Sequence, residues 1–418
     1  MSQWRRPSWL AIVLCGLLFV AFTGLASWAY RWRMAHEIKQ LTATCEVARK
    51  SGNWDQLEHL AQRLKQIEPT SGQPLLYLAE SAQMKGQLEQ AVAFLGQFPE
   101  LDLRAPQVLA EKANLEWGEL NRPFDALQTC EDLIHLRPTT TYAHARIISF
   151  YTMTLQRSKM LMSIRRAIKL RAEPREVYAY AIMADAPTFV NGSTLNARWQ
   201  LSASESSVFD IAFAIFTAIS RQEQVDEQLT STREEAAQKA RAGVEELHAR
   251  FPHNSVLLGF LLSKNIEEGN VDRVEELLKL ISFETEADYL LWIYRGWFQT
   301  LRRELDAAEI SFRRALELHP LSWQARHEYA VLFRKKQRLD LAEEMGNLAM
   351  EGREIRKELL ALPNAREIPD ETLQRIAKYA EKCGDTDVAE ALHRRLTPVQ
   401  VPRQPLSENT ERSLGLGR

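Results

Sequence analysis

Side chains that could do chemistry are present in this chain, but no pattern groups them into a recognisable active site. The nine histidines are dispersed. His248 and His253 lie five residues apart with Pro252 between them, a spacing that does not put two metal ligands on one helix face. The sequence contains no GxxxxGK(S/T) or GxGxxG phosphate loop, no HExxH or Cys/His zinc spacing, and no GxSxG nucleophile elbow. We therefore expect no catalytic, cofactor-binding or metal-ligating residues and no enzyme activity.

One segment keeps an enzymatic alternative open. Residues 185–207 contain Pro187, Asn191-Gly192 and a Ser-rich run, a composition typical of a loop or a disrupted structural element. The polar residues Asp185, Asn191, Ser193 and Asn196 lie within it. Their spacing names no reaction, so this alternative is an unrecognised site in the insert.

The elements that would position any site follow a period of about 34 residues between Leu41 and Leu396. The clearest copy runs from Tyr289 to Pro320 and contains, in order, Trp292, Gly296, Ala308, Phe312 and Ala315. Further copies start at Ile38, Gly72, Gln107, Thr141, Arg221, Ser255, Trp323 and Asp370. Small residues at positions 8 and 20 let two antiparallel helices approach closely, Gly at position 15 suits the turn between them, and Pro at position 32 ends the second helix.

On these residues the chain resembles the tetratricopeptide repeat family over residues 38–397. The copy at Tyr289 keeps the Trp, the Gly, the A-x3-F and the Pro of the signature, and departs from it at Arg295 and Gln299. The resemblance implies an all-α fold, a right-handed superhelical solenoid of stacked antiparallel helix pairs. Sel1-like and half-a-tetratricopeptide arrays are the alternatives.

The register breaks once. From Thr141 to Arg221 is 80 residues, which is two repeats plus 12, and the excess falls in the 185–207 insert. We predict the following segments: an N-terminal tail (1–8), a transmembrane anchor (9–30), N-terminal repeats (31–174), an irregular repeat with the insert (175–220), C-terminal repeats (221–352), an irregular connector (353–369), a terminal helix pair or cap (370–397) and a disordered tail (398–418).

Charge and cysteine content limit the class of partner. The net charge is only −2, which argues against a general nucleic-acid surface because such a surface needs a basic excess. The four cysteines, Cys15, Cys45, Cys130 and Cys383, are scattered singly without CxxC spacing. Three of them lie at helix positions of the repeats, where we expect small buried apolar residues.

The N-terminus predicts a membrane anchor. Residues 9–30 contain no charge, and about 20 residues suffice to cross a bilayer. Arg5 and Arg6 precede this stretch, Arg31 and Arg33 follow it, and aromatic residues cluster at its ends. A cleaved signal peptide is the alternative. The basic residues on the two sides of this stretch are nearly equal in number, so they hardly decide its orientation. The short N-terminal tail favours an orientation with the repeats on the outer side of a bacterial-type inner membrane.

The resemblance also implies where a partner would bind. In this family, positions 2, 5, 9, 12 and 13 of each first helix line a concave groove. In the copy at Tyr289 these residues are Leu290, Ile293, Trp297, Thr300 and Leu301, an apolar set. In the next copy they are Gln324, His327, Val331, Arg334 and Lys335, a basic set. An apolar patch beside a basic one suits an amphipathic or C-terminally acidic peptide. Trp297 could equally pack against a neighbouring repeat.

These features together predict a membrane-tethered scaffold that binds a protein or peptide through Leu290, Ile293, Trp297, His327, Arg334 and Lys335. We expect no cofactor, no nucleic acid and no small-molecule substrate. A more specific alternative is an assembly or maturation factor for an envelope or secreted complex, which differs from the scaffold only in its partner.

Overall fold

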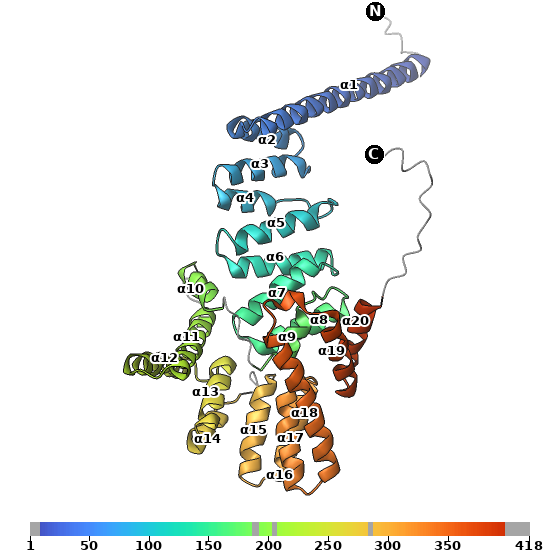
Figure 1. Cartoon of the computed structure of the whole chain (residues 1–418). Coiled ribbons are helices and arrows are strands. Elements are labelled where there is room, and N and C mark those ends of the chain that lie inside the picture. Colours follow the sequence, from blue (N-terminus) through green and yellow to red (C-terminus); the bar gives the residue numbers. More distant parts are fainter. Residues whose placement is uncertain (1–8, 186–191, 203–206, 283–286, 398–418) are drawn as a thin grey trace, which may run out of the picture. The chain divides into compact units, whose positions relative to one another are not determined.

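The fold is described from a computed structural model that covers residues 9–185, 192–202, 207–282 and 287–397. Every regular element in these ranges is helical (Figure 1). The chain divides into two compact units, residues 1–137 and residues 138–418. The predicted tails 1–8 and 398–418 lie outside the described residues.

The first unit consists of three antiparallel helix pairs. Its helices are α1 (Trp9–Lys50), α2 (Trp54–Ile67), α3 (Gln73–Met84), α4 (Leu88–Leu95), α5 (Ala105–Trp117) and α6 (Pro123–Leu136). Cys45, Leu57, Leu64 and Leu78 form a buried cluster between α1, α2 and α3. This burial is the main stabilising contribution, because a single amphipathic pair leaves its apolar face exposed.

The second unit repeats the same pairing over a longer stretch. Its helices are α7 (Thr141–Met153), α8 (Arg157–Lys169), α9 (Val177–Ile182), α10 (Gly192–Ser202), α11 (Ser207–Glu227), α12 (Ser231–Arg250), α13 (Ser255–Glu267), α14 (Val271–Lys279), α15 (Tyr289–Leu301), α16 (Leu305–Leu318), α17 (Trp323–Lys335), α18 (Leu339–Leu360), the short 3-10 helix η2 (Ala365–Glu367), α19 (Asp370–Lys382) and α20 (Thr386–Leu396). One contiguous apolar core extends through this unit from Ile148 to Leu392.

The 34-residue register of the sequence coincides with helix starts for some of the predicted copies but not for all: Ile38 and Arg221 lie inside α1 and α11, and Gln107 is the third residue of α5. Five predicted repeat starts, Thr141, Ser255, Tyr289, Trp323 and Asp370, are the first residues of α7, α13, α15, α17 and α19. The helix pairs therefore have the spacing expected for a tetratricopeptide-like arrangement.

In most of the described helix pairs, though not between α11 and α12, one residue of the turn that joins the two helices lies in the left-handed region. Gly52, Gly86, Gly269 and Gly384 have φ between +69° and +75° there, where a side chain would be strained. Other repeats use a non-glycine residue at the same kind of turn: Asn121, Leu155, Arg303 and Gln337, with φ between +54° and +63°. Arg171, with φ +55°, has the same backbone conformation but follows α8, at the end of a pair. The backbone geometry is thus more regular than the glycine pattern that predicts it.

Close contact between the two helices of a pair depends on small residues. A Cβ on Gly296 in α15 would lie 2.6 Å from the Phe312 ring of α16, so glycine is required for this approach. Ala308, Phe312 and Ala315 are completely buried in α16. The predicted role of positions 8 and 20 is confirmed for this pair.

Consecutive repeats are linked by ion pairs between residues 27 positions apart. Nitrogen–oxygen distances are 2.8 Å for Lys85–Glu58, 2.7 Å for Arg302–Glu275 and 2.6 Å for Lys336–Glu309. In each pair the basic residue follows the first helix of one repeat and the acidic residue lies on the second helix of the repeat before it.

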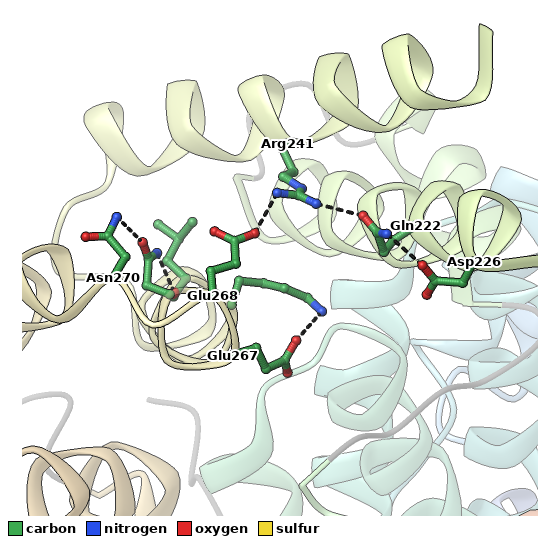
Figure 2. A network of polar contacts seen from close by, with 9 residues as sticks. Gln222, Asp226, Arg241, Glu267, Glu268 and Asn270 are labelled. Atoms are coloured by element: carbon green, nitrogen blue, oxygen red, sulfur yellow. Dashed lines mark hydrogen bonds and ion pairs between the residues drawn. The ribbon is translucent and has the colours of Figure 1, made fainter. Parts of the chain in front are cut away.

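The fourth ion pair of this spacing has its charges exchanged. Arg241 of α12 donates to Glu268, which follows α13, at 2.7 Å and also to Gln222 of α11 at 2.7 Å (Figure 2). Gln222 donates in turn to Asp226 at 2.9 Å. The position in the repeat is therefore kept although the polarity of the pair is reversed.

Two segments that the sequence predicts to be irregular contain helix. The helix α10 lies within the 185–207 insert, and α18 continues to Leu360, into the predicted connector. Trp199 explains α10: it is buried against Phe150 and Phe209, at ring-centroid distances of 5.8 and 5.4 Å. Residues 186–191 and 203–206 of the insert lie outside the described residues.

The prediction of a transmembrane anchor at residues 9–30, and with it a single-pass membrane localisation, is wrong. Within the described residues, no helix has a stretch both long enough and apolar enough to cross a bilayer. The uncharged stretch is not a separate helix. It begins the 42-residue helix α1, which continues through Arg31, Arg33 and Glu37 into the first repeat.

Cys45 and Cys383 are free thiols. Cys45 and Cys130 are buried and Cys383 is partly buried. Burial raises the pKa of the Cys45 and Cys383 thiols to about 11, so both are protonated and unreactive near neutral pH.

Candidate functional site

The two helices predicted to carry the groove are α15 and α17, and each begins at a side-chain cap. Asp288 accepts a hydrogen bond from the Leu290 N–H at 3.1 Å, and Ser322 accepts one from the Ala325 N–H at 3.1 Å. These caps satisfy backbone donors that the first helical turn leaves unpaired. They fix where each helix starts and hence which residues share a face.

The structure separates the six predicted groove residues into two groups. Leu290 and Ile293 are 2% and 1% exposed and belong to the core of the second unit, so a partner cannot contact them in this state. Trp297 is partly buried and packs against the same core. The apolar side of the predicted groove is therefore largely used for packing within the chain.

The basic residues have the opposite environment. His327, Arg334 and Lys335 are exposed on α17. Lys335 Nζ donates to the Thr300 carbonyl of α15 at 3.4 Å, and Arg334 Nε donates to the Ala330 carbonyl at 3.3 Å. We call His327, Arg334, Lys335 and the neighbouring exposed Leu301 the basic face of α15 and α17.

Cations just beyond the basic face differ in their partners. Lys336 Nζ lies 2.7 Å from Asp306 and 2.6 Å from Glu309, and Arg338 lies 3.2 Å from Glu309. No carboxylate of the described residues lies within 4.0 Å of Arg334, Lys335 or His327. The basic face therefore holds positive charge that the described part of the chain does not neutralise by direct pairing.

One acidic residue lies close to this charge. Burial raises the pKa of the Glu328 carboxyl, while His327 and Lys335 act in the opposite direction. The raised pKa means that desolvation is the dominant influence on Glu328. Its carboxylate makes no direct ion pair with either neighbour and leaves both available.

Two of the polar residues named in the insert, Asp185 and Asn196, have structural roles. Asp185 pairs with Arg356 at 3.1 Å. The Asn196 side chain is fully buried and donates to the carbonyls of Met153 at 2.8 Å and Gly192 at 2.7 Å. Asn191 lies outside the described residues. The described ranges also contain no group of three or more His, Cys, Asp or Glu side chains that could hold a metal ion.

Sequence reasoning missed a set of arginine contacts in the second unit. Arg157 and Arg165 of α8 bind the carboxylates of Asp288 and Asp385, the N-cap residues of α15 and α20. These partners are 131 and 220 residues away in the sequence. No repeat pattern connects residues at such separations, so the sequence offered no signal for them.

No protein-family model matches the chain, and comparison with curated proteins finds no similar sequence. Solved structures share its helical arrangement at low similarity. A tetratricopeptide repeat protein from Parabacteroides merdae is 14% identical, with 74% of this chain and 99% of that chain covered and a TM-score of 0.25.

Two further solved structures give similar values. The human IFIT1 dimer with PPP-AAAA is 12% identical, with 84% and 88% of the two chains covered and a TM-score of 0.32. Yeast Tom70 is 15% identical, with 86% and 76% covered and a TM-score of 0.24. At these TM-scores the fold is established by the chain's own helix pairs rather than by the likeness.

Proposed function

We propose that this chain is a protein-binding scaffold and that the basic face of α15 and α17 contacts its partner. The observation that supports this most directly is the contrast in pairing. Lys336 and Arg338 are neutralised by carboxylates of the preceding repeat, whereas Arg334 and Lys335 donate to backbone carbonyls and pair with no carboxylate of the described residues. Exposed cations that their own repeat array does not neutralise attract an acidic ligand.

The ligand class follows from the composition of this face. Leu301 is 46% exposed and lies beside the point where Lys335 reaches α15. An amphipathic peptide with acidic residues along one side could bury an apolar side chain against Leu301 while its carboxylates pair with Arg334 and Lys335. Binding of this kind involves no catalytic step and no cofactor.

The proposal is tested with a fluorescein-labelled acidic amphipathic helical peptide and the purified full-length chain. Fluorescence anisotropy should show binding that weakens between about 50 and 300 mM salt, because exposed charges are screened over a Debye length of about 10 Å at 0.1 M. The variant Arg334→Glu/Lys335→Glu should lose this binding. Trp297→Ala combined with Arg334→Glu tests whether the partly buried indole contributes as well.

The matched control changes the same charge on α16, the second helix of the preceding repeat. Arg313 and Arg314 are both exposed on α16, and Arg313→Glu/Arg314→Glu should bind the peptide like the wild-type chain. Equal loss in both double variants would show that the peptide responds only to net charge. Unchanged binding after Arg334→Glu/Lys335→Glu would exclude the basic face.

A further inference from the structure

Residues 173–185, which we call the docked segment, do not form a helix pair. The segment follows α8, where the 34-residue register breaks, and contains the six-residue helix α9. Val177, Tyr178 and Ile182 are 0%, 1% and 2% exposed. An apolar stretch too short to be a repeat is thus largely buried in the core of the second unit, with Tyr180 and Met183 partly buried.

The carboxylates of the docked segment each face an arginine from the C-terminal end of the same unit. The pairs are Glu173 with Arg395, Glu176 with Arg366 at 3.5 Å, and Asp185 with Arg356 at 3.1 Å. Arg395 also donates to the Glu173 carbonyl at 2.6 Å and lies over the Tyr178 ring, 5.9 Å from its centroid. In the opposite sense, Arg175 binds the Ile368 carbonyl and pairs with Asp370.

This mode of attachment differs from that of the repeats. Repeats are joined by ion pairs 27 residues apart, whereas Arg356 and Asp185 are separated by 171 residues. Arginines of α18, η2 and α20 pair with the carboxylates of the docked segment. Its helix α9 contacts both α18 and α8, and Arg157 of α8 donates to the Ala184 carbonyl at 2.7 Å. Carboxylates paired with arginines on either side of buried apolar side chains are contacts that would also hold an acidic peptide.

We propose that the surface formed by α18, η2 and α20 is a recognition site for an acidic amphipathic segment of a partner protein, and that the docked segment occupies this site in cis. The ligand that fits this site has three carboxylates with the spacing of Glu173, Glu176 and Asp185. The second carboxylate follows the first by three residues, the third follows the second by nine, and apolar residues lie between the second and the third. Charge complementarity with Arg356, Arg366 and Arg395 identifies this chemistry. The site is distinct from the basic face of α15 and α17.

The test uses the full-length chain and a labelled synthetic peptide with the sequence of residues 172–185. In the wild-type chain the cis segment competes, so the peptide should bind weakly. In Glu176→Lys/Asp185→Lys the cis segment is repelled by Arg366 and Arg356, and the peptide should bind at least about tenfold more tightly, because apparent affinity scales with the fraction of open sites. A peptide carrying the same two Lys substitutions should bind neither chain.

Charge exchange provides the matched control. Adding Arg356→Glu/Arg366→Glu to Glu176→Lys/Asp185→Lys places opposite charges together again and should restore the wild-type melting temperature. The site in this fourfold variant should also prefer the Lys-substituted peptide over the unsubstituted one. If Glu176→Lys/Asp185→Lys does not fold, the melting temperature of the fourfold variant is the test. A melting temperature that is not restored would overturn the proposal. A folded variant that binds the unsubstituted peptide no better than wild type would also overturn it. If that variant dimerises without peptide, as measured by light scattering, the proposal of a separate partner protein would be overturned, because the ligand of the site would be a second copy of this chain.

Discussion

Gly296 allows the sharpest test of the packing that defines each helix pair. Alanine in place of a helical glycine ordinarily stabilises by about 1 kcal/mol through backbone entropy. At Gly296, however, the new Cβ would lie 2.6 to 2.9 Å from three atoms of the Phe312 ring. Phe312 is completely buried and its ring lies 5.8 Å from that of Tyr329, so it has little room to move. Overpacking of this kind costs about 1 to 3 kcal/mol.

We therefore expect Gly296→Ala to destabilise the second unit by about 1 kcal/mol net, the overpacking cost less the gain in helix propensity. The matched control is Gly346→Ala in α18, where the added Cβ meets nothing within 4 Å. That variant should be more stable than wild type by about 1 kcal/mol. Urea unfolding followed by tryptophan fluorescence and circular dichroism measures both changes.

A second substitution identifies the contact responsible. Phe312→Leu removes part of the ring, so its combination with Gly296→Ala should be more stable than the sum of the two single effects by about 1 kcal/mol or more. Stabilisation of Gly296→Ala to the same extent as Gly346→Ala would refute the close-contact explanation. Additivity of the double variant would mean that the clash is relieved elsewhere.

Three further predictions concern turns, linking ion pairs and pH. Arg303→Gly and Gln337→Gly should each raise the free energy of unfolding by up to about 1 kcal/mol, because φ values of +63° and +58° strain residues that have a side chain. Gly269→Ala, at φ +74°, should lower the free energy of unfolding in the same urea assay. Arg241→Glu should cost less than about 1 kcal/mol because the pair with Glu268 is roughly half exposed, and Arg241→Glu/Glu268→Arg should regain the loss in a thermal melt. Burial lowers the pKa of His319 from 6.5 to about 3, so the unfolded chain binds a proton that the folded chain excludes. The free energy of unfolding should therefore fall as the pH falls below about 6.5, by up to about 1.4 kcal/mol per pH unit. His319→Gln should reduce this pH dependence in unfolding curves measured at pH 7.5, 6.5 and 5.5. An equal pH dependence in both proteins would contradict the prediction.

The repeat register was predictable because it rests on local steric rules. Gly296, Ala308 and Pro320 each act within one helix pair, so their spacing carries the information. Turns at Leu155 and Arg303 adopt the same left-handed backbone without glycine, so the residue type gives no sign of it. The continuation of α18 had a usable signal, since Ile355 and Leu359 are buried one helical turn apart.

The candidate site was predictable only in part. Helix geometry determines that Leu290 and Ile293 share a face with Trp297, but not whether another element covers that face. The basic residues Arg334 and Lys335 were identified from type and position, whereas their lack of carboxylate partners depends on where Asp306 and Glu309 point. The arginines that hold the docked segment were missed entirely, because Arg395 and Glu173 meet only through the fold of the second unit.

Two kinds of coupling act in the second unit, and they affect binding differently. The ion pairs spaced by 27 residues join only neighbouring repeats. The contacts from Arg165 to Asp385 and from Arg157 to Asp288 join distant helices, and both aspartates also cap helices. Because Asp288 caps α15, the orientation of that helix is tied to α8. The basic face of α15 and α17 is then preorganised, which lowers the entropic cost of binding a partner.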